Sequence, residues 1–234
     1  MDEGVLPPKL LTRLSKAADL IRGHDFIQVF SHYDADGISA AAIVAKALLR
    51  DGRDFRVTLF TTLDDDSMSV IRDTDADCIV VTDLGASYIK EFDAMACDVI
   101  VLDHHTVIDD AERICYVNPH LHGMDGMVAG CGATMAFLFA IALDEGNWDL
   151  VQVAFAGIAG DRQHVNGLTG LNVHLLEEGV DRGHLEAAEG SLIPPGGLRD
   201  NLLTSSEPYI SGVSGDEAGV LALLAEAGAD PAGS

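Results

Sequence analysis

The sequence predicts an α/β protein with a mostly parallel, five-stranded sheet flanked by helices, followed by a mainly helical second half. Two observations predict this class. In the first half, short apolar runs rich in branched residues alternate with helix-like segments, as in βαβ units. In the second half, the apolar segments are longer and have helical spacing. A composition of 48% apolar and 22% charged residues excludes a disordered chain and a fibrous repeat.

The elements of the first half follow one another in order. Segment 8–22 is expected to be an amphipathic helix, because its leucines and alanines recur at helical spacing opposite its lysines and arginines. Clear helices are also expected at 38–49 and 87–95. The expected strands are 26–30, 55–60, 78–81, 99–102 and 114–117.

Helices of the second half are expected at 129–143, 150–158 and 171–178. The charge-free stretch 126–143 is almost long enough to span a bilayer. Its flanking aspartates and internal glycines favour a buried helix instead, so no membrane partner is expected.

The chain changes character after residue 188. Closely spaced glycines and prolines indicate an irregular connector, which leads into a short helix at 216–227. We therefore expect one domain over residues 1–188, and over 189–234 the edge of a second domain.

The 234-residue chain has 38 acidic and 14 basic residues, a formal net charge of −24. This charge repels phosphate backbones, so it excludes binding of nucleic acid by bulk electrostatics, and a phosphate partner needs local help such as metal ions. The acidity fits either a salt-adapted surface or a solubility device. Four cysteines without a CxxC pair, in a chain without a signal peptide, indicate reduced, mostly buried thiols and a cytoplasmic protein.

Three potential metal ligands share one predicted strand-to-helix turn. The first strand runs into Ser-His-Tyr-Asp-Ala-Asp-Gly at 31–37, which places His32, Asp34 and Asp36 before the next helix. In an open α/β sheet this turn lies at the carboxyl edge, where ligands bind, and Gly37 permits the tight geometry. An Asp-rich loop with a helix cap is the alternative interpretation.

Further acids and imidazoles follow later elements. Asp83 comes after the third strand, and Asp103, His104 and His105 come after the fourth, while Asp161 ends an uncharged helical segment. Because the carboxyl ends of parallel strands meet at one edge, these side chains should converge, and unpaired like charges would repel one another. A bound cation is the expected remedy.

Mixed carboxylate and imidazole ligands without thiolate favour Mn²⁺, with Mg²⁺, Co²⁺, Fe²⁺ and Zn²⁺ as weaker candidates. The acids and imidazoles are numerous enough for two ions. Two divalent ions can activate a hydroxide and hold the attacking and leaving oxygens of a phosphoryl group. The residues therefore indicate phosphoester hydrolysis.

Four motifs occur in order between residues 32 and 161: His-x-Asp-x-Asp-Gly, Thr-Asp-Leu-Gly, Asp-His-His and Gly-Asp. Together they resemble the DHH phosphoesterase superfamily. The Ser-His-Tyr-Asp-Ala-Asp-Gly-Ile segment, the 118–126 stretch and Pro-Tyr-Ile-Ser-Gly at 208–212 are most similar to archaeal RecJ-like nucleases. The resemblance implies a five-stranded, mostly parallel sheet with two divalent metal ions in its crevice.

The resemblance also implies roles for individual residues. Asp34 would bind one metal ion, Asp36 would bind the other, and Asp83 would bridge them. His104 would complete the second site together with Asp161. The implied metal ligands are His32, Asp34, Asp36, Asp83, His104 and Asp161.

Three further assignments come from the same resemblance. His32 would bind the first ion, although some RecJ relatives carry aspartate at this position. His105 would lie near the scissile phosphate, and Asp103 would orient an imidazole from behind the ligands. Separately from the resemblance, Arg162 and His164 follow directly after Asp161 and are candidates for contacts with substrate phosphates, although a solvated turn is the favoured interpretation for this pair.

Other small and polar residues give weaker signals. The residues at 130–134 open an apolar helix, where they either bring backbone amides to a phosphate or allow close helix packing. His120 and His122 are candidates for the mouth of the crevice. His174 is expected at the surface.

The sequence departs from the family in one respect. RecJ-like enzymes carry a second, DHH-associated domain with a Gly-Gly-Gly-His-type motif, and no such motif precedes Ser234. We expect either a natural minimal form or a truncated catalytic domain, and either leaves the chain-length preference and the polarity of cleavage open.

The leading hypothesis is a metal-dependent phosphodiesterase or exonuclease that cleaves single-stranded DNA, single-stranded RNA or short oligonucleotides. One alternative is a small-substrate phosphoesterase acting on nanoRNA, phosphoadenosine phosphate or a cyclic dinucleotide. The other is a non-catalytic replication scaffold, because the family includes relatives that lost their metal ligands and persist as helicase partners. An active enzyme could also dock on a replication complex such as GINS. The presence of every expected ligand favours the enzyme.

Overall fold

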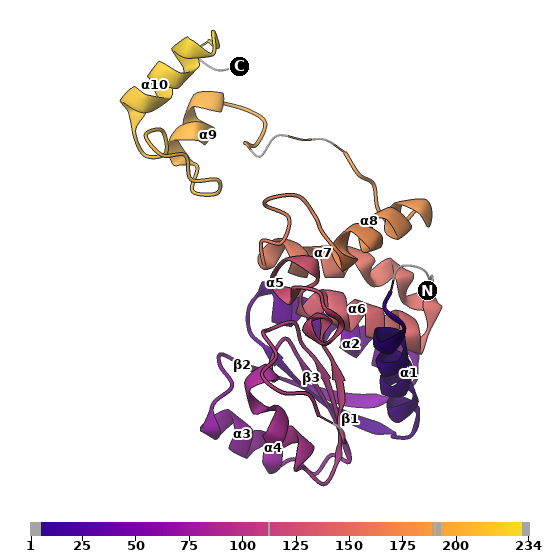
Figure 1. The fold of residues 1–234 in the computed structure, drawn as a ribbon. Helices are drawn as coiled ribbons and strands as arrows, with labels where there is room; N and C mark the ends of the chain where they lie inside the picture. The colour runs from indigo at the N-terminus through magenta and orange to yellow at the C-terminus, as the bar shows by residue number, and fades with distance from the viewer. Residues whose placement is uncertain (1–5, 112, 189, 191–192, 231–234) are drawn as a thin grey trace. The chain divides into compact units, whose positions relative to one another are not determined.

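The computed structural model describes residues 6–111, 113–188, 190 and 193–230. The chain divides into two compact units, Met1–Glu186 and Ala187–Ser234. The first unit contains the sheet and its flanking helices, and the second contains α9 (Leu198–Thr204) and α10 (Glu217–Glu226) (Figure 1).

The first unit is built around a five-stranded sheet in which every neighbouring pair of strands is parallel. The spatial order is β2-β1-β3-β4-β5. The predicted α/β class is confirmed, and the sheet is wholly rather than mostly parallel. The strands are β1 (Phe26–His32), β2 (Asp54–Phe60), β3 (Cys78–Thr82), β4 (Asp98–Leu102) and β5 (Cys115–Val117).

The register of the central strands sets up the carboxyl edge of the sheet. Ser31 of β1 pairs with Thr82 of β3, and Thr82 pairs with Leu102 of β4. The three strands therefore end close to one level. Asp83 and Asp103, which follow directly, leave the sheet at the same edge, where α/β proteins bind their ligands.

Alternate strand residues face two separate hydrophobic cores, one on each side of the sheet. Val80 belongs to the larger core, which contains buried residues of α1, α2, α6, α7 and α8. Val81 belongs to the opposite core, with α3 and α4 (Figure 1). The helices of this unit are α1 (Pro8–Arg22), α2 (Ala35–Arg50), α3 (Asp65–Arg72), α4 (Ile89–Asp93), α5 (Gly126–Ala129), α6 (Gly132–Leu143), α7 (Val151–Gly160) and α8 (Leu171–Asp181).

Several helix boundaries differ from those expected. The helix expected at 38–49 begins earlier, as α2, because the Asp34 carboxylate accepts a hydrogen bond from the Gly37 N–H and caps it. The helix expected at 87–95 is a 3-10 turn, η1 (Ala86–Tyr88), followed by the short α4. Helix α3 was not expected from the sequence.

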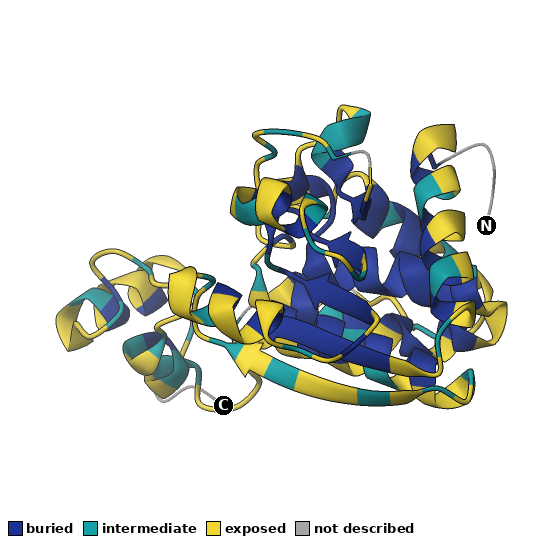
Figure 2. Ribbon diagram, turned by 90° about the horizontal axis from the view of Figure 1, so that it is seen from below, coloured by how far each residue is buried: buried dark blue, intermediate teal, exposed yellow. Residues whose placement is uncertain are grey.

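The charge-free stretch is buried over most of its length, although Met127 and Val128 are exposed. All residues of α6 except Ala142 are buried, and the interior of the unit is dark blue in Figure 2. The helix expected at 129–143 begins only at Gly132, because Gly130 has the extended ψ of 121° and separates α5 from α6. No helix of the described residues is long and apolar enough to cross a membrane.

Two expectations about single residues have different outcomes. The four cysteines are free, and Cys78, Cys115 and Cys131 are buried, as expected for reduced thiols. His174 was expected at the surface but is buried, because it shares the inward face of α8 with Leu171.

The second unit has its own small apolar core. Leu202 of α9 and Val220 and Leu224 of α10 are buried in it together with Val213. The irregular connector expected after residue 188 therefore contains a helix, α9, which the glycines and prolines around it concealed.

Candidate metal centre

The turn between β1 and α2 gives one aspartate two functions. Oδ1 of Asp34 accepts the hydrogen bond from the Gly37 N–H at 2.9 Å, while Oδ2 lies 2.9 Å from Nδ1 of His32. A helix cap and a metal ligand are therefore compatible, because they use different oxygens. Gly37 is required in this turn, since a Cβ at this position would lie 2.3 Å from the carbonyl oxygen of His32.

The described residues include three groups of potential ligands, each with ligand atoms within 4.8 Å of one another. One joins Asp83 and His104 to Asp103 and His105, and the other two, which hold the implied metal ligands, are the two ligand groups considered below. His32, Asp34 and Asp83 form the first of these two. Nδ1 of His32 lies 3.6 Å from Oδ2 of Asp83. The other ring nitrogen, Nε2, lies 3.3 Å from the carbonyl oxygen of Thr61. A hydrogen bond donated by Nε2 to this carbonyl leaves the lone pair of Nδ1 free for a cation.

Asp36, His104 and Asp161 form the second group. Nε2 of His104 lies 3.5 Å from Oδ2 of Asp161 and 3.8 Å from Oδ2 of Asp36. Nδ1 of His104 lies 2.9 Å from the carbonyl oxygen of Gly126. Donation of the Nδ1 proton to this carbonyl fixes the tautomer whose Nε2 lone pair faces the carboxylates.

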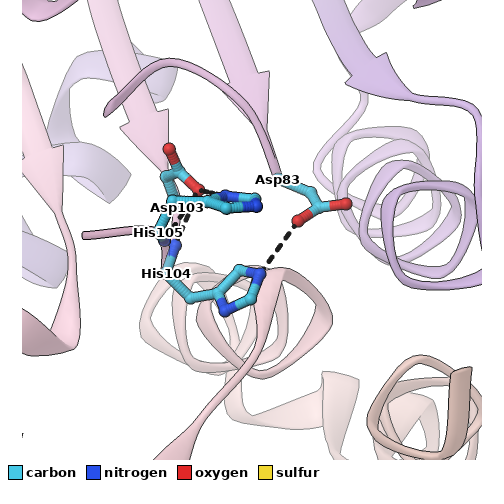
Figure 3. Close-up of side chains that lie close together, drawn as sticks. All are labelled: Asp83, Asp103, His104 and His105. Carbon is cyan, nitrogen blue, oxygen red and sulfur yellow. Dashed lines mark hydrogen bonds and ion pairs between the residues drawn. The ribbon is translucent and has the colours of Figure 1, made fainter. Parts of the chain in front are cut away.

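Asp83 lies between the two groups. Its Oδ1 is 3.2 Å from Nε2 of His104 (Figure 3), and its Oδ2 faces His32. The backbone φ of Asp83 is 55°, an uncommon value for a residue with a side chain, and its N–H donates to the Leu102 carbonyl at 2.9 Å. A carboxylate with one oxygen toward each group is positioned to bridge two cations.

Backbone amides at the start of α6 hold the Asp36 carboxylate. The Gly132 N–H donates to Oδ2 at 2.7 Å, and the Ala133 N–H donates to Oδ1 at 2.8 Å. The interpretation in which these amides meet a substrate phosphate is therefore wrong for this pair. The packing interpretation fits, because a Cβ on Gly132 would lie 2.6 Å from the Cβ of Asp83.

A layer of neutral groups, which the sequence did not lead us to expect, lies behind the ligands. Nε2 of Gln163 donates to Oδ2 of Asp161 at 3.2 Å and to the Gly126 carbonyl at 2.9 Å. Oε1 of Gln163 accepts a hydrogen bond from Nδ2 of Asn172 at 2.8 Å. The position of Gln163 two residues after Asp161 is the one signal in the sequence that pointed to it. These groups orient the ligands of the second group.

The ionisable groups of the site perturb one another. Burial raises the pKa of Asp83 to about 8, and the charge of Asp36 adds to this rise while the hydrogen bond with His104 opposes it. Burial alone would lower the pKa of His104, but the hydrogen bond to Asp83 and the surrounding carboxylates raise it to about 10. So many buried carboxylates need a counter-charge. Carboxylate oxygens and imidazole nitrogens, with no thiolate in any group found among the described residues, fit a divalent cation.

Asp103 is fully buried and organises the loop that follows β4. Its Oδ1 lies 2.7 Å from Nδ1 of His105 (Figure 3), and its Oδ2 accepts the Ala86 N–H at 2.8 Å. The hydrogen bond to Asp103 raises the pKa of His105, whose side chain is about half exposed. This is the arrangement implied by the resemblance, and the part that the pair plays in catalysis stays a prediction.

Arg162 and His164 lie outside the ligand groups found among the described residues. Both are exposed in the turn after α7, and Arg162 has a φ of 58°. Their contact with substrate stays a prediction. His120 lies closer to the site, because its Nε2 accepts the Gly126 N–H at 3.2 Å and the Gly126 carbonyl holds His104.

Comparisons with known proteins bear on the same residues. The model of the DHH family, N-terminal domain, matches residues 26–158. An uncharacterised protein of Methanocaldococcus jannaschii is 31% identical over 179 residues, which are 73% of this chain and 41% of that protein. A prophage-derived protein of Bacillus subtilis, provisionally named a single-strand DNA-specific exonuclease, is 27% identical over 156 residues, 58% of this chain and 25% of its own length. The chain thus spans less than half the length of either relative.

Solved structures share the fold. Exonuclease RecJ bound to manganese aligns with 94% of this chain and 56% of its own, at 23% identity and a TM-score of 0.60. CDC45 from Entamoeba histolytica aligns with 97% of this chain and 52% of its own, at 16% identity and a TM-score of 0.67. At these identities the likeness establishes the architecture of the chain.

Proposed function

Because the chain belongs to the DHH family, we propose that it is a metal-dependent hydrolase of phosphodiester bonds that acts as an exonuclease on single-stranded DNA, single-stranded RNA or short oligonucleotides. One observation supports this proposal above the others. Asp83 directs its two carboxylate oxygens toward two separate groups of ligands, as a two-metal phosphoesterase requires. The names of the RecJ structure and of the Bacillus relative point to the same substrate class.

The proposed cofactor is a pair of divalent cations, Mn²⁺ first and Mg²⁺ or Co²⁺ as alternatives. His32 and Asp34 would hold one cation, and Asp36, His104 and Asp161 would hold the other, with Asp83 between them. When bound, the cations neutralise the phosphate charge and activate a water molecule for attack on phosphorus. The chain itself contributes the orientation of each ligand, through the Gly126 carbonyl, the amides at the start of α6 and Gln163.

His105 is the proposed contact to the phosphate that is cleaved. Asp103 accepts the hydrogen bond from its Nδ1, so the imidazole presents Nε2 to the substrate. The hydrogen bond to Asp103 raises the pKa of His105 and so favours the doubly protonated ring, whose Nε2–H can donate to a phosphate oxygen and stabilise the charge that develops there. Arg162 and His164 remain candidate contacts to more distant phosphates.

Two other functions remain candidates. A small-substrate phosphoesterase would use the same centre on nanoRNA, phosphoadenosine phosphate or a cyclic dinucleotide. A replication scaffold, alone or docked on a GINS-type protein, is favoured by the likeness to CDC45. Against a purely structural role, every ligand that the resemblance implies lies in one of the two ligand groups.

Hydrolysis of labelled single-stranded DNA and RNA oligonucleotides, with Mn²⁺, Mg²⁺ or EDTA, tests the proposal. The decisive variant is Asp83→Ala, because it removes the carboxylate shared by both groups. We expect Mn²⁺-dependent stepwise shortening by the wild type and a rate lower by several orders of magnitude in the variant, with the fold retained. The matched control is Asp73→Ala, which removes an exposed carboxylate at the end of α3.

The outcomes separate the candidate functions. If Asp83→Ala cuts as fast as wild type, the assigned centre is wrong. If the wild type cuts no oligonucleotide but hydrolyses a dinucleotide or phosphoadenosine phosphate, the small-substrate function replaces the exonuclease. Partner binding that survives Asp83→Ala while hydrolysis vanishes would show that docking and catalysis are independent.

A further inference from the structure

A second feature of the carboxyl edge is a pocket of about 540 Å³ on the far side of His105. Its walls come from the loops after β2, β3 and β4, and Asp103 and His105 line it. Leu63, Leu84 and Tyr88 also belong to the core under α3 and α4, whereas the two ligand groups adjoin α2, α6 and α7. His105 therefore stands between the metal centre and the pocket.

The pocket has little positive charge for a second phosphate. No lysine or arginine occurs among the residues that line it within the described part of the chain, and the proposed function assigns its histidine, His105, to the phosphate that is cleaved. The one carboxylate in its wall, Asp103, is fully buried and accepts hydrogen bonds from the N–H groups of Ala86 and His104 and from His105. Only hydroxyl groups are then left as donors, so an uncharged group is a better occupant than a second phosphate.

The lining combines apolar surface with hydroxyl groups. Ile108 is 75% exposed and Met127 is 51% exposed at this pocket, although both are large apolar side chains. Ser87 lies in the same wall as the ring of Tyr88 and adds a hydroxyl. An exposed apolar rim with a few polar groups is typical of a site for a flat, partly polar ligand.

The loop after β3, which forms one wall of the pocket, is held in place by Asp103 at the carboxyl edge of the sheet. Oδ2 of Asp103 fixes the Ala86 amide, and Oδ1 of the same carboxylate holds His105. Gly85 allows the loop to turn, because its φ is +120° and a Cβ there would lie 2.9 Å from Cγ1 of Val101. The position of the wall and the position of His105 are thus set by one buried side chain.

We propose that this pocket binds a nucleoside of the substrate, base and sugar together, directly beside the phosphate that His105 contacts. The inference deepens the proposed function and rests on it for the identity of the bound phosphate. The volume is ample for a base and its sugar, the described lining has no lysine or arginine for a further phosphate, and Tyr88 offers a ring for stacking. The pocket would let the enzyme distinguish a nucleotide from an inorganic or simple alkyl phosphate ester.

Two esters with the same leaving group test the proposal. Thymidine 5′-(p-nitrophenyl phosphate) and methyl p-nitrophenyl phosphate both release p-nitrophenol, and only the first carries a nucleoside. We expect kcat/KM of the wild type with Mn²⁺ to be roughly 10- to 100-fold higher for the thymidine ester, the range of one stacked base. Ser87→Trp fills the pocket from an exposed position and should bring this ratio close to one. The control Ser15→Trp, on the exposed side of α1, should keep the wild-type ratio.

A second measurement keeps the pocket separate from the chemistry. Ligand-detected NMR with adenosine and thymidine at millimolar concentration, in EDTA, should show binding to the wild type and to Ser15→Trp but not to Ser87→Trp. The pocket proposal is wrong if the wild type hydrolyses both esters with equal kcat/KM, or if Ser87→Trp keeps the wild-type ratio of kcat/KM for the two esters. If neither ester is hydrolysed, the proposed function fails, and nucleoside binding alone then tests the pocket. The pocket proposal holds if the nucleosides bind the wild type but not Ser87→Trp. It is wrong if the nucleosides bind neither protein or bind both proteins.

Discussion

Gly157 of α7 is where a single added methyl group should disturb the metal centre most directly. It is buried where α7 meets α2 and α6, and a Cβ built on it would lie 2.4 Å from the Cβ of Ala133. The same Cβ would lie 2.6 Å from Oδ1 of Asp36, the oxygen that accepts the Ala133 N–H. Gly157→Ala therefore tests the packing and the ligand arrangement together.

The magnitude follows from these distances. Carbon atoms in contact are roughly 3.5–4.0 Å apart, so α7 and α6 must separate by about 1.1–1.6 Å, or Asp36 must move. Overpacking costs about 1–3 kcal/mol, and the better helix propensity of alanine returns about 1 kcal/mol. Loss of one amide hydrogen bond to the carboxylate adds about 1.5–3 kcal/mol. The expected decrease in the free energy of unfolding is about 1.5–5 kcal/mol.

Thermal unfolding followed by circular dichroism and Mn²⁺ binding followed by calorimetry measure the two effects. We expect Tm to fall by at least about 3 °C and the affinity of one Mn²⁺ to fall by about 10- to 100-fold, as when the support of a ligand is lost. Gly197→Ala is the matched control, because its φ is −57° and the nearest atom to its Cβ is 4.0 Å away. If Gly157→Ala unfolds and binds Mn²⁺ like the wild type, the close approach of α7 to Asp36 is refuted.

Two further predictions concern the stability of the whole chain. Arg50 donates two hydrogen bonds to Asp149 at 2.7 Å and lowers the pKa of its carboxyl group. The pair should therefore stabilise the fold above the unfolded pKa of about 3.9. This stabilisation should be lost as the pH falls through the lower folded pKa. The free energy of unfolding of Asp149→Asn should be lower than that of the wild type at pH 7 by about 1 kcal/mol or less, and the difference should shrink as the pH falls below about 3.9. A difference that stays constant would contradict the assignment. The net charge of −24 predicts that Tm rises between 0.1 and 1 M KCl, because the screening length falls from about 10 to about 3 Å; an unchanged Tm would show that self-repulsion does not limit stability.

The strands were predictable because each is a compact apolar run, and their boundaries differ from the expected ones by one or two residues. Helix α3 was not predictable in the same way, since its eight residues bury only Met68 and Ile71 and give too short a helical period. The split between α5 and α6 occurs where Gly130 is extended, and the charge-free sequence around it gives no sign of this break. The pattern of apolar residues therefore predicted the fold class, whereas the positions of the helix ends depend on local backbone geometry.

The convergence of Asp83, His104 and Asp161 was predictable because parallel strands bring their carboxyl ends to one edge. The groups that orient these ligands were not predictable. The Gly126 carbonyl and the Gly132 amide are backbone groups, and backbone groups leave no mark in the sequence. The pocket beside His105 could not be predicted either, because its lining residues come from three loops and from α5, whose approach only the folded chain shows.

The acidity of the chain and a polyanionic substrate can be reconciled at the carboxyl edge. Without cations, the clustered carboxylates repel phosphate, and the raised pKa of Asp83 reflects how unfavourable a further buried negative charge is there. Two divalent cations, as proposed, would neutralise the four ligand carboxylates, while salt screens the rest of the surface beyond roughly 10 Å at 0.1 M. A flexible single strand can place one phosphate at the cations and turn the next ones away from the acidic surface. A rigid duplex cannot do so, and the neutral pocket beside His105 offers no compensating charge. Under the proposed function, the same carboxylates would therefore make binding depend on metal and favour short or single-stranded substrates.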